Sequence, residues 1–178
     1  MNLEPYIPSF ALRKELPKND VHADRVVVVQ PDSSIDVDIM TVPITFAELY
    51  TSASDGDVTK VRKILDAKAD PNASDRTGQR PLLVAAAEGH VDVCRTLGER
   101  GADVMATNSL GATALALAVT AGHARTVEAL LRLGADVNCR DIWLDTPLTT
   151  ACRRCHPLSL VELLVDSGAD PSLKNRLV

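Results

Sequence analysis

Five consecutive residues near the carboxyl end carry the most reactive side chains of the chain, in the order Cys152, Arg153, Arg154, Cys155 and His156. Two thiols three positions apart, followed directly by a histidine, form the C-x-x-C-H string through which haem is attached covalently. The same cysteines could instead form a redox dithiol or supply two ligands of a zinc site. These alternatives together make up the hypothesis of a haem, metal or redox protein.

The rest of the sequence gives this hypothesis little support. A structural zinc ion needs four ligands, and the other cysteines, Cys94 and Cys139, do not form a second C-x-x-C pair. No Ser/His/Asp constellation, glycine-rich phosphate loop or paired-carboxylate motif stands out. The start of the chain shows no secretory signal, so the cysteines are expected to be free thiols in a reducing compartment. We therefore expect no enzyme, no cofactor and no bound metal, and a cytoplasmic location with the nucleus as an alternative.

Composition favours packed helices. The 178 residues are 46% hydrophobic and 24% charged, the usual mixture of a globular protein, but only 3% aromatic. A core with so few rings must use Leu, Val, Ile and Ala, which favours helices over a sandwich or barrel. The net charge of −5 disfavours a general nucleic-acid binder, and no apolar run approaches the roughly 20 residues that cross a bilayer.

The sequence repeats itself every 33 residues. Glycine recurs at Gly56, Gly89 and Gly122, and an Ala-Asp pair recurs with the same step at 69–70, 102–103 and 135–136, then one residue late at 169–170. Each copy contains a turn, a short Ala-rich helix, a tight corner, a second helix with paired aliphatic residues, and a loop. A period of this length is typical of repeat arrays.

These segments resemble the ankyrin repeat. The resemblance covers residues 42–174 and implies an all-α solenoid, in which each unit has a β-turn or hairpin followed by a helix–turn–helix. The repeats are expected at 42–74, 75–107, 108–140 and 141–174. Residues 1–41 do not repeat and are expected to form an N-terminal leader, extended or partly a strand or hairpin, and residues 175–178 form the C-terminal end.

Several positions depart from the family pattern. Leu144 and Cys155 stand where the family usually has glycine, and the fourth repeat has one extra residue near its corner. Gly98 lies inside a helix where other copies have an aliphatic residue, and we expect it to be a weak point, because glycine costs roughly 0.5–1 kcal/mol of helix propensity relative to alanine. The last helix, 158–165, is apolar on its expected outer face. We expect a further repeat, a partner or a self-contact to cover that face.

In ankyrin proteins the concave face, made by hairpin tips and first helices, binds other proteins. The resemblance therefore implies a non-catalytic protein–protein interaction module; the alternative is a regulatory or targeting fragment of a longer protein, which could be catalytic. Carried over by register, the candidate contact residues are Arg76, Thr77, Gln79, Glu88, Leu110, Arg140, Ile142, Trp143, Asp145, Arg153 and Arg154.

The candidate contact residues also suggest the chemistry of the partner. Trp143 lies beside Ile142, and Trp and Arg contribute most to interface energies, so Trp143 is expected to be the anchor. Arg140, Arg153 and Arg154 are expected to surround it. We therefore expect the partner to be a protein or peptide, acidic and with an apolar anchor, and neither a membrane nor a nucleic acid.

Overall fold

The structure is a computed structural model that describes residues 44–176. The predicted leader, including its candidate hairpin, and the last two residues lie outside this range. Eight helices make up the described part: α1 (Ile44–Ser54), α2 (Val58–Asp66), α3 (Pro81–Glu88), α4 (Val91–Glu99), α5 (Ala114–Ala121), α6 (Ala124–Arg132), α7 (Pro147–Arg153) and α8 (Leu158–Asp166).

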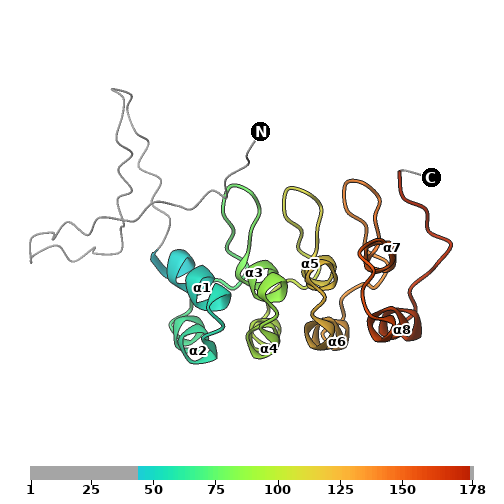
Figure 1. The fold of residues 1–178 in the computed structure, drawn as a ribbon. Helices are drawn as coiled ribbons and strands as arrows, with labels where there is room; N and C mark the ends of the chain where they lie inside the picture. Colours follow the sequence, from blue (N-terminus) through green and yellow to red (C-terminus); the bar gives the residue numbers. More distant parts are fainter. Residues whose placement is uncertain (1–43, 177–178) are drawn as a thin grey trace, which may run out of the picture. The chain divides into compact units, whose positions relative to one another are not determined.

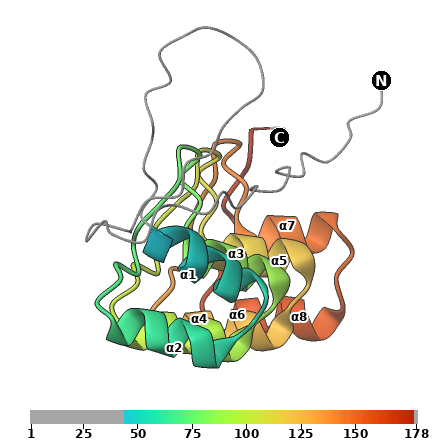
Figure 2. The ribbon, with the colours of Figure 1, turned by 90° about the vertical axis from the view of Figure 1, so that its left-hand side faces the viewer.

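The helices pair along the chain and stack in two layers. One layer holds α1, α3, α5 and α7, the other holds α2, α4, α6 and α8, and the long loops between successive pairs project from the same side (Figures 1 and 2). Helices contact their equivalents in the next pair, such as α3 with α5 and α4 with α6. Each predicted repeat contains one pair, and the predicted all-α repeat array is confirmed.

A glycine in a left-handed conformation ends the first helix of the second repeat. Gly89 has φ of +82°, its N–H donates to the carbonyl of Ala86, and the next N–H, of His90, donates back to Ala85 at 2.9 Å. This pair of bonds satisfies carbonyls at the helix end and turns the chain into the second helix. The same corner recurs at Gly122.

The corner of the fourth repeat keeps this geometry without glycine. Cys155 has φ of +54°, its N–H donates to the carbonyl of Cys152 at 3.2 Å, and the N–H of His156 donates to Ala151 at 3.1 Å. The extra residue of this repeat is therefore placed after the corner. Pro157 occupies the N-cap of α8, a place that His123 takes at α6.

Histidines at the corners tie neighbouring repeats together. Nε2 of His90 lies 2.8 Å from the carbonyl oxygen of Ser54, at the end of α1, and Nε2 of His123 lies 3.1 Å from that of Ala87 in α3. Each ring also covers the glycine of the preceding corner, since a Cβ added to Gly56 would lie 2.6 Å from Nδ1 of His90. The histidines and glycines are thus parts of one inter-repeat contact.

Asparagine side chains make a second contact between repeats, which we call the amide clasp. The Asn72 amide donates to the carbonyl of Gly101 at 2.9 Å and accepts from the N–H of Asp103 at 2.7 Å. Asn138 makes the same two bonds to the loop that follows α8. A side chain that both donates and accepts therefore fixes one loop against the next.

The clasp between the second and third repeats has a methionine instead. The sulfur of Met105 accepts from the N–H of Asp136 at 3.3 Å. A thioether is a weak acceptor and has no N–H, so it cannot donate to the carbonyl of Gly134 as an asparagine would. This clasp is therefore only half formed.

Gly98 lies against a side chain of the following repeat. A Cβ added to Gly98 would lie 2.7 Å from Cδ1 and 2.9 Å from Cδ2 of Leu133. Leu133, which follows α6, already fills the space that aliphatic residues occupy in the other repeats. The glycine lets the next repeat approach closely.

Candidate protein-binding surface

One side-chain oxygen closes the tip of each of the last three hairpins. In the fourth repeat, Oδ1 of Asp141 accepts from the N–H groups of Trp143 and Asp145, both at 2.9 Å. Asp75 and Asn108 accept the equivalent pairs of bonds in the second and third repeats. The tips are thus built by local hydrogen bonds, as Asx turns are.

The tips are also bonded to one another. The N–H of Ile142 donates to the carbonyl of Leu110 at 3.2 Å, and the N–H of Arg176 donates to the carbonyl of Trp143 at 3.1 Å. A bond of the same kind joins the tips of the second and third repeats. Side chains at neighbouring tips are therefore held in a fixed relation before any partner arrives.

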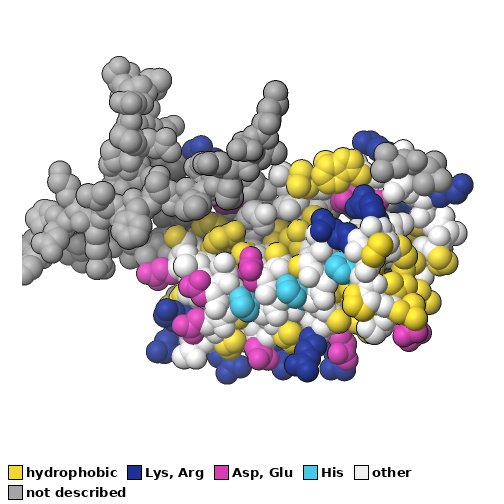
Figure 3. Space-filling model, viewed as in Figure 1, with side chains coloured by type: hydrophobic (Ala, Val, Ile, Leu, Met, Phe, Trp, Pro, Cys, Tyr) yellow, Lys and Arg dark blue, Asp and Glu magenta, His cyan; other side chains and the backbone are white. Residues whose placement is uncertain are grey.

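Four apolar side chains gather at the tips of the third and fourth repeats. Leu110 is 47% exposed, Ile142 45%, Trp143 48% and Leu144 38%, and we call this group the tip patch. Figure 3 shows hydrophobic side chains beside Lys and Arg side chains at the α7 end of the array. Exposed apolar side chains that cluster in this way mark interaction sites more often than scattered ones do.

Leu144 joins the tip patch at a conformational cost. Its φ is +62°, in the region that Gly78 and Gly111 occupy at the same position of the preceding tips. A side chain there costs roughly 1–2 kcal/mol. The sequence shows that glycine is missing here, but Leu144 is not among the predicted contact residues. Three successive apolar residues at a hairpin tip were the available signal.

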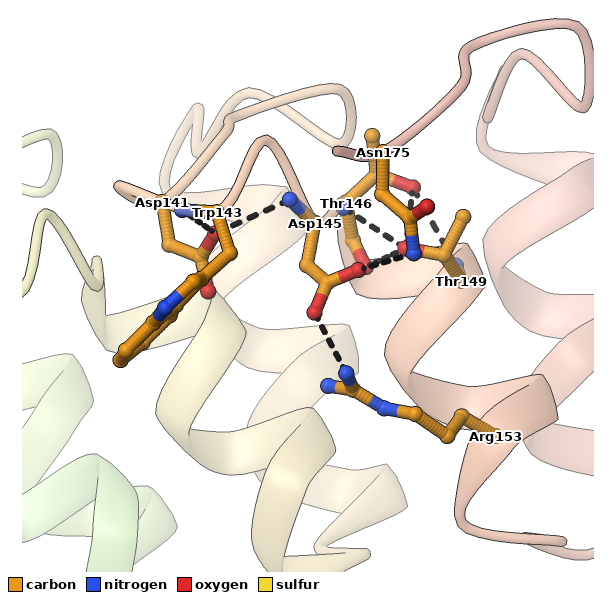
Figure 4. Close-up of polar contacts among 7 residues, drawn as sticks. All are labelled: Asp141, Trp143, Asp145, Thr146, Thr149, Arg153 and Asn175. Atoms are coloured by element: carbon orange, nitrogen blue, oxygen red, sulfur yellow. Dashed lines mark hydrogen bonds and ion pairs between the residues drawn. The ribbon is translucent and has the colours of Figure 1, made fainter. Parts of the chain in front are cut away.

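Asp145 was predicted to contact the partner, and the structure corrects this. Its side chain is buried, with 5% of the residue exposed, and one carboxylate oxygen lies 2.7 Å from Nη1 of Arg153. The other oxygen accepts from the amide of Asn175 at 2.8 Å (Figure 4). The indole of Trp143 extends away from this ion pair. Asp145 and Arg153 therefore fix the loop beneath the tip.

A capping box holds the start of α7 beneath the same tip. The Thr146 hydroxyl accepts from the N–H of Thr149 at 3.2 Å, and the Thr149 hydroxyl accepts from the N–H of Thr146 at 2.8 Å. Pro147 occupies the first turn, where a missing N–H costs nothing. These contacts, drawn in Figure 4, connect the hairpin rigidly to the helix.

The other predicted contact residues lie at two places along the array. Arg140 is exposed two residues before Ile142, Arg154 is exposed at the end of α7, and the exposed Arg176, whose N–H donates to the Trp143 carbonyl, was not among the predicted residues. In the second repeat Arg76 and Thr77 are exposed and Gln79 is half-buried. The last of the predicted set, the exposed Glu88, ends α3.

The surface around α1 and α3 is negative. The pKa of the Tyr50 hydroxyl is raised above its usual value, first by partial burial and then by the carboxylates of Asp75 and Glu88. Along the layer of α1, α3, α5 and α7, Figure 3 shows acidic side chains toward α1 and basic ones toward α7. The face thus has an acidic end and a basic end.

The C-x-x-C-H string lies at the corner between α7 and α8. Cys152 and Cys155 are exposed, whereas Nε2 of His156 is buried and has no hydrogen-bond partner. Within residues 44–176, no group of three or more His, Cys, Asp and Glu side chains is arranged to hold a metal ion. Burial raises the pKa of the Cys94 thiol to about 12, and burial also raises the pKa of Cys139.

A comparison with protein-family models finds a match. A family model described as ankyrin repeats (3 copies) matches residues 49–141 and, in an overlapping second match, residues 107–175. A search of curated proteins finds no match. Among the described residues, none of the helices has the length and apolar character needed to cross a membrane.

Proposed function

The chain belongs to the ankyrin repeat family, and on that premise we propose that it is a non-catalytic module that binds a protein partner through the concave face, anchored at the tip patch. Ankyrin repeats generally act as protein–protein interaction modules. The observation that carries the proposal is the exposure of Trp143 within a cluster of apolar side chains on a hydrogen-bonded hairpin.

Trp143 suits the role of an anchor for two reasons. A large aromatic side chain buries much apolar area on binding, and such residues dominate interface energies. The hairpin that carries it is already fixed by Asp141 and by the Ile142–Leu110 bond, so binding costs little ordering of the loop. The strain at Leu144 points the same way, since strained residues cluster at ligand-binding sites.

The charges around the tip patch define the partner. Arg140 and Arg176 are exposed beside the hairpin and Arg154 is exposed at the end of α7, so the partner presents acidic residues beside its apolar anchor. Asp75 and Glu88 repel the same acidic residues at the other end of the face. The acidic part of the partner therefore lies over the fourth repeat, and added salt slows association.

The single tryptophan of the chain allows a direct test. Two synthetic peptides without tryptophan are compared, one with a leucine between aspartates and one with the same leucine between lysines. We expect the acidic peptide to give a saturable blue shift of Trp143 fluorescence, because the indole leaves water. Its affinity should fall as salt increases, because the attraction is screened.

The lysine peptide serves as the control and should leave the emission unchanged. Equal responses to both peptides would mean that charge does not select the partner. A saturable response that persists in an Arg140→Glu, Arg154→Glu double variant would equally contradict the assignment of the basic end.

A further inference from the structure

The two ends of the array differ from its interior. In the second helices of the middle repeats, Cys94 and Val127 are fully buried. Val161, their equivalent in α8, is half-buried, and on the same helix face Leu158 is 70% exposed and Val165 49%. Leu158, Val161 and Val165 follow one another at steps of about one helical turn and form an apolar stripe. We call this stripe the C-terminal end face.

The first layer is open at the same end. Ala86 in α3 and Val119 in α5 are fully buried, whereas Cys152, at the same position of α7, is exposed. In both helix layers, the C-terminal end face therefore presents one side of an inter-repeat contact. Within the described residues, no repeat covers it.

The opposite end exposes the other half of the same contact. Val93 in α4 and Thr126 in α6 are buried, and both helices contact the second helix of the preceding repeat. Their equivalent in α2 is Lys60, which is exposed, and with Lys63 and Ile64 it lines a hollow of ≈ 570 Å³. We call this surface the N-terminal end face.

The wall of the hollow that α1 provides consists mainly of small side chains. Ala47, Thr51 and Ser52 line it together with the carboxylates of Glu48 and Asp55, and Ile64 adds an aliphatic side chain from α2. Such a surface accepts aliphatic side chains from a helix that lies alongside, as α2 itself does against α4.

We propose that the C-terminal end face binds the N-terminal end face of a second copy of this chain, head to tail. The contact continues the stacking of second helices, with the apolar stripe of α8 lying along α2 of the other copy. A head-to-tail contact does not close on itself, so it leads to short open chains whose length depends on concentration. The tip patch takes no part in it.

Charge complementarity in the second layer of helices favours a second copy of this chain as the partner at the end faces. Glu162 and Asp166 are the charged side chains of α8, whereas Lys60 and Lys63 line the hollow at α2. The lysine stems can cover the apolar stripe while their ammonium groups reach the carboxylates at its rim. Within one copy, Lys60 lies 3.5 Å from the exposed carboxylate of Asp57, a pair of little energetic weight.

The first layer is complementary as well. The exposed Arg154 follows α7, and its equivalent in the first repeat is the exposed Asp55 after α1. Contact between two α8 helices would instead place Glu162 and Asp166 against the same carboxylates of the other copy. Charge therefore favours the head-to-tail contact over a symmetric one.

Two charge-reversed variants of the full chain test the proposal by sedimentation. One carries Glu162→Lys and Asp166→Lys, and the other carries Lys60→Glu and Lys63→Glu. We expect the average mass of the unchanged chain to rise with concentration above 19.1 kDa, and each variant alone to associate at least about tenfold more weakly. An equimolar mixture of the two variants should associate again, because each end face then meets its opposite charge.

The control is Glu99→Lys, an exposed reversal at the end of α4 that should leave association unchanged. A chain that stays monomeric at all concentrations overturns the proposal. Association that survives Lys60→Glu, Lys63→Glu also overturns it, because a symmetric contact through α8 would not involve α2. The proposal is also overturned if the mixture of the two variants fails to associate while both variants remain helical by circular dichroism.

Discussion

Replacing Met105 by asparagine should stabilise the array, because it completes the amide clasp between the second and third repeats. Asn72 and Asn138 show what the completed clasp contains, namely a bond donated to a glycine carbonyl and a bond accepted from an aspartate N–H. At this junction the only such bond runs from the N–H of Asp136 to sulfur, at 3.3 Å.

The size of the effect follows from the bonds exchanged. Two hydrogen bonds contribute a net of about 0.5–1.5 kcal/mol each, so the asparagine supplies about 2 kcal/mol. Losing the sulfur contact and the buried part of the Met105 side chain, which is 43% exposed, offsets about 1 kcal/mol. The net gain is about 1 kcal/mol, which raises the melting temperature by about 3 °C in an array of this size.

Urea denaturation of Met105→Asn, followed by circular dichroism, measures this gain. The reverse change, Asn138→Met, is the matched control and should lower the free energy of unfolding by a similar amount. If Asn138→Met is destabilising while Met105→Asn leaves the midpoint unchanged or lowers it, the clasp does not transfer between junctions and the reasoning fails.

Three further changes have defined outcomes. Gly98→Ala should stabilise the fold by less than the roughly 0.5–1 kcal/mol of helix propensity, because Leu133 must move to make room. In a Leu133→Ala background the same change should give the full stabilisation. Equal stabilisation in both backgrounds, measured by urea denaturation, would contradict this prediction. Leu144→Gly should stabilise the fold by about 1 kcal/mol, by relief of its positive φ, and yet weaken binding of the acidic peptide; a variant with unchanged affinity would remove Leu144 from the tip patch. A thiol reagent at pH 8 should label the two exposed cysteines in the native state and Cys94 only after unfolding, since the raised pKa keeps Cys94 protonated; rapid native labelling of Cys94 would show that it is not buried.

The repeat architecture could be predicted from the sequence because it depends on spacing along the chain. Gly89 and Gly122 mark corners that need a positive φ, and the Ala-Asp loops recur with the same step. The exposure of Trp143 also followed from register, since the position lies at the tip of a hairpin. Local conformational rules and repetition suffice for such features.

The sequence did not reveal the side-chain contacts that bring distant positions together. Asp145 is buried beside Asn175, which lies 30 residues along the chain, and beside Arg153 of the same repeat. Gly98 leaves no gap because Leu133 of the following repeat fills the space. These contacts depend on how closely two repeats approach, which the spacing within one repeat does not determine.

The affinity of Trp143→Ala for the acidic peptide, measured by calorimetry beside the unchanged chain, tests the proposed binding function most directly. The proposal predicts a loss of about 2 kcal/mol or more, roughly 30-fold in affinity, with an unchanged melting temperature. Met105→Ala, which removes an apolar side chain of similar exposure outside the tip patch, should bind as the unchanged chain does. Equal affinity of Trp143→Ala and the unchanged chain, or an equal loss in Met105→Ala, would contradict the proposal that the tip patch is the anchor.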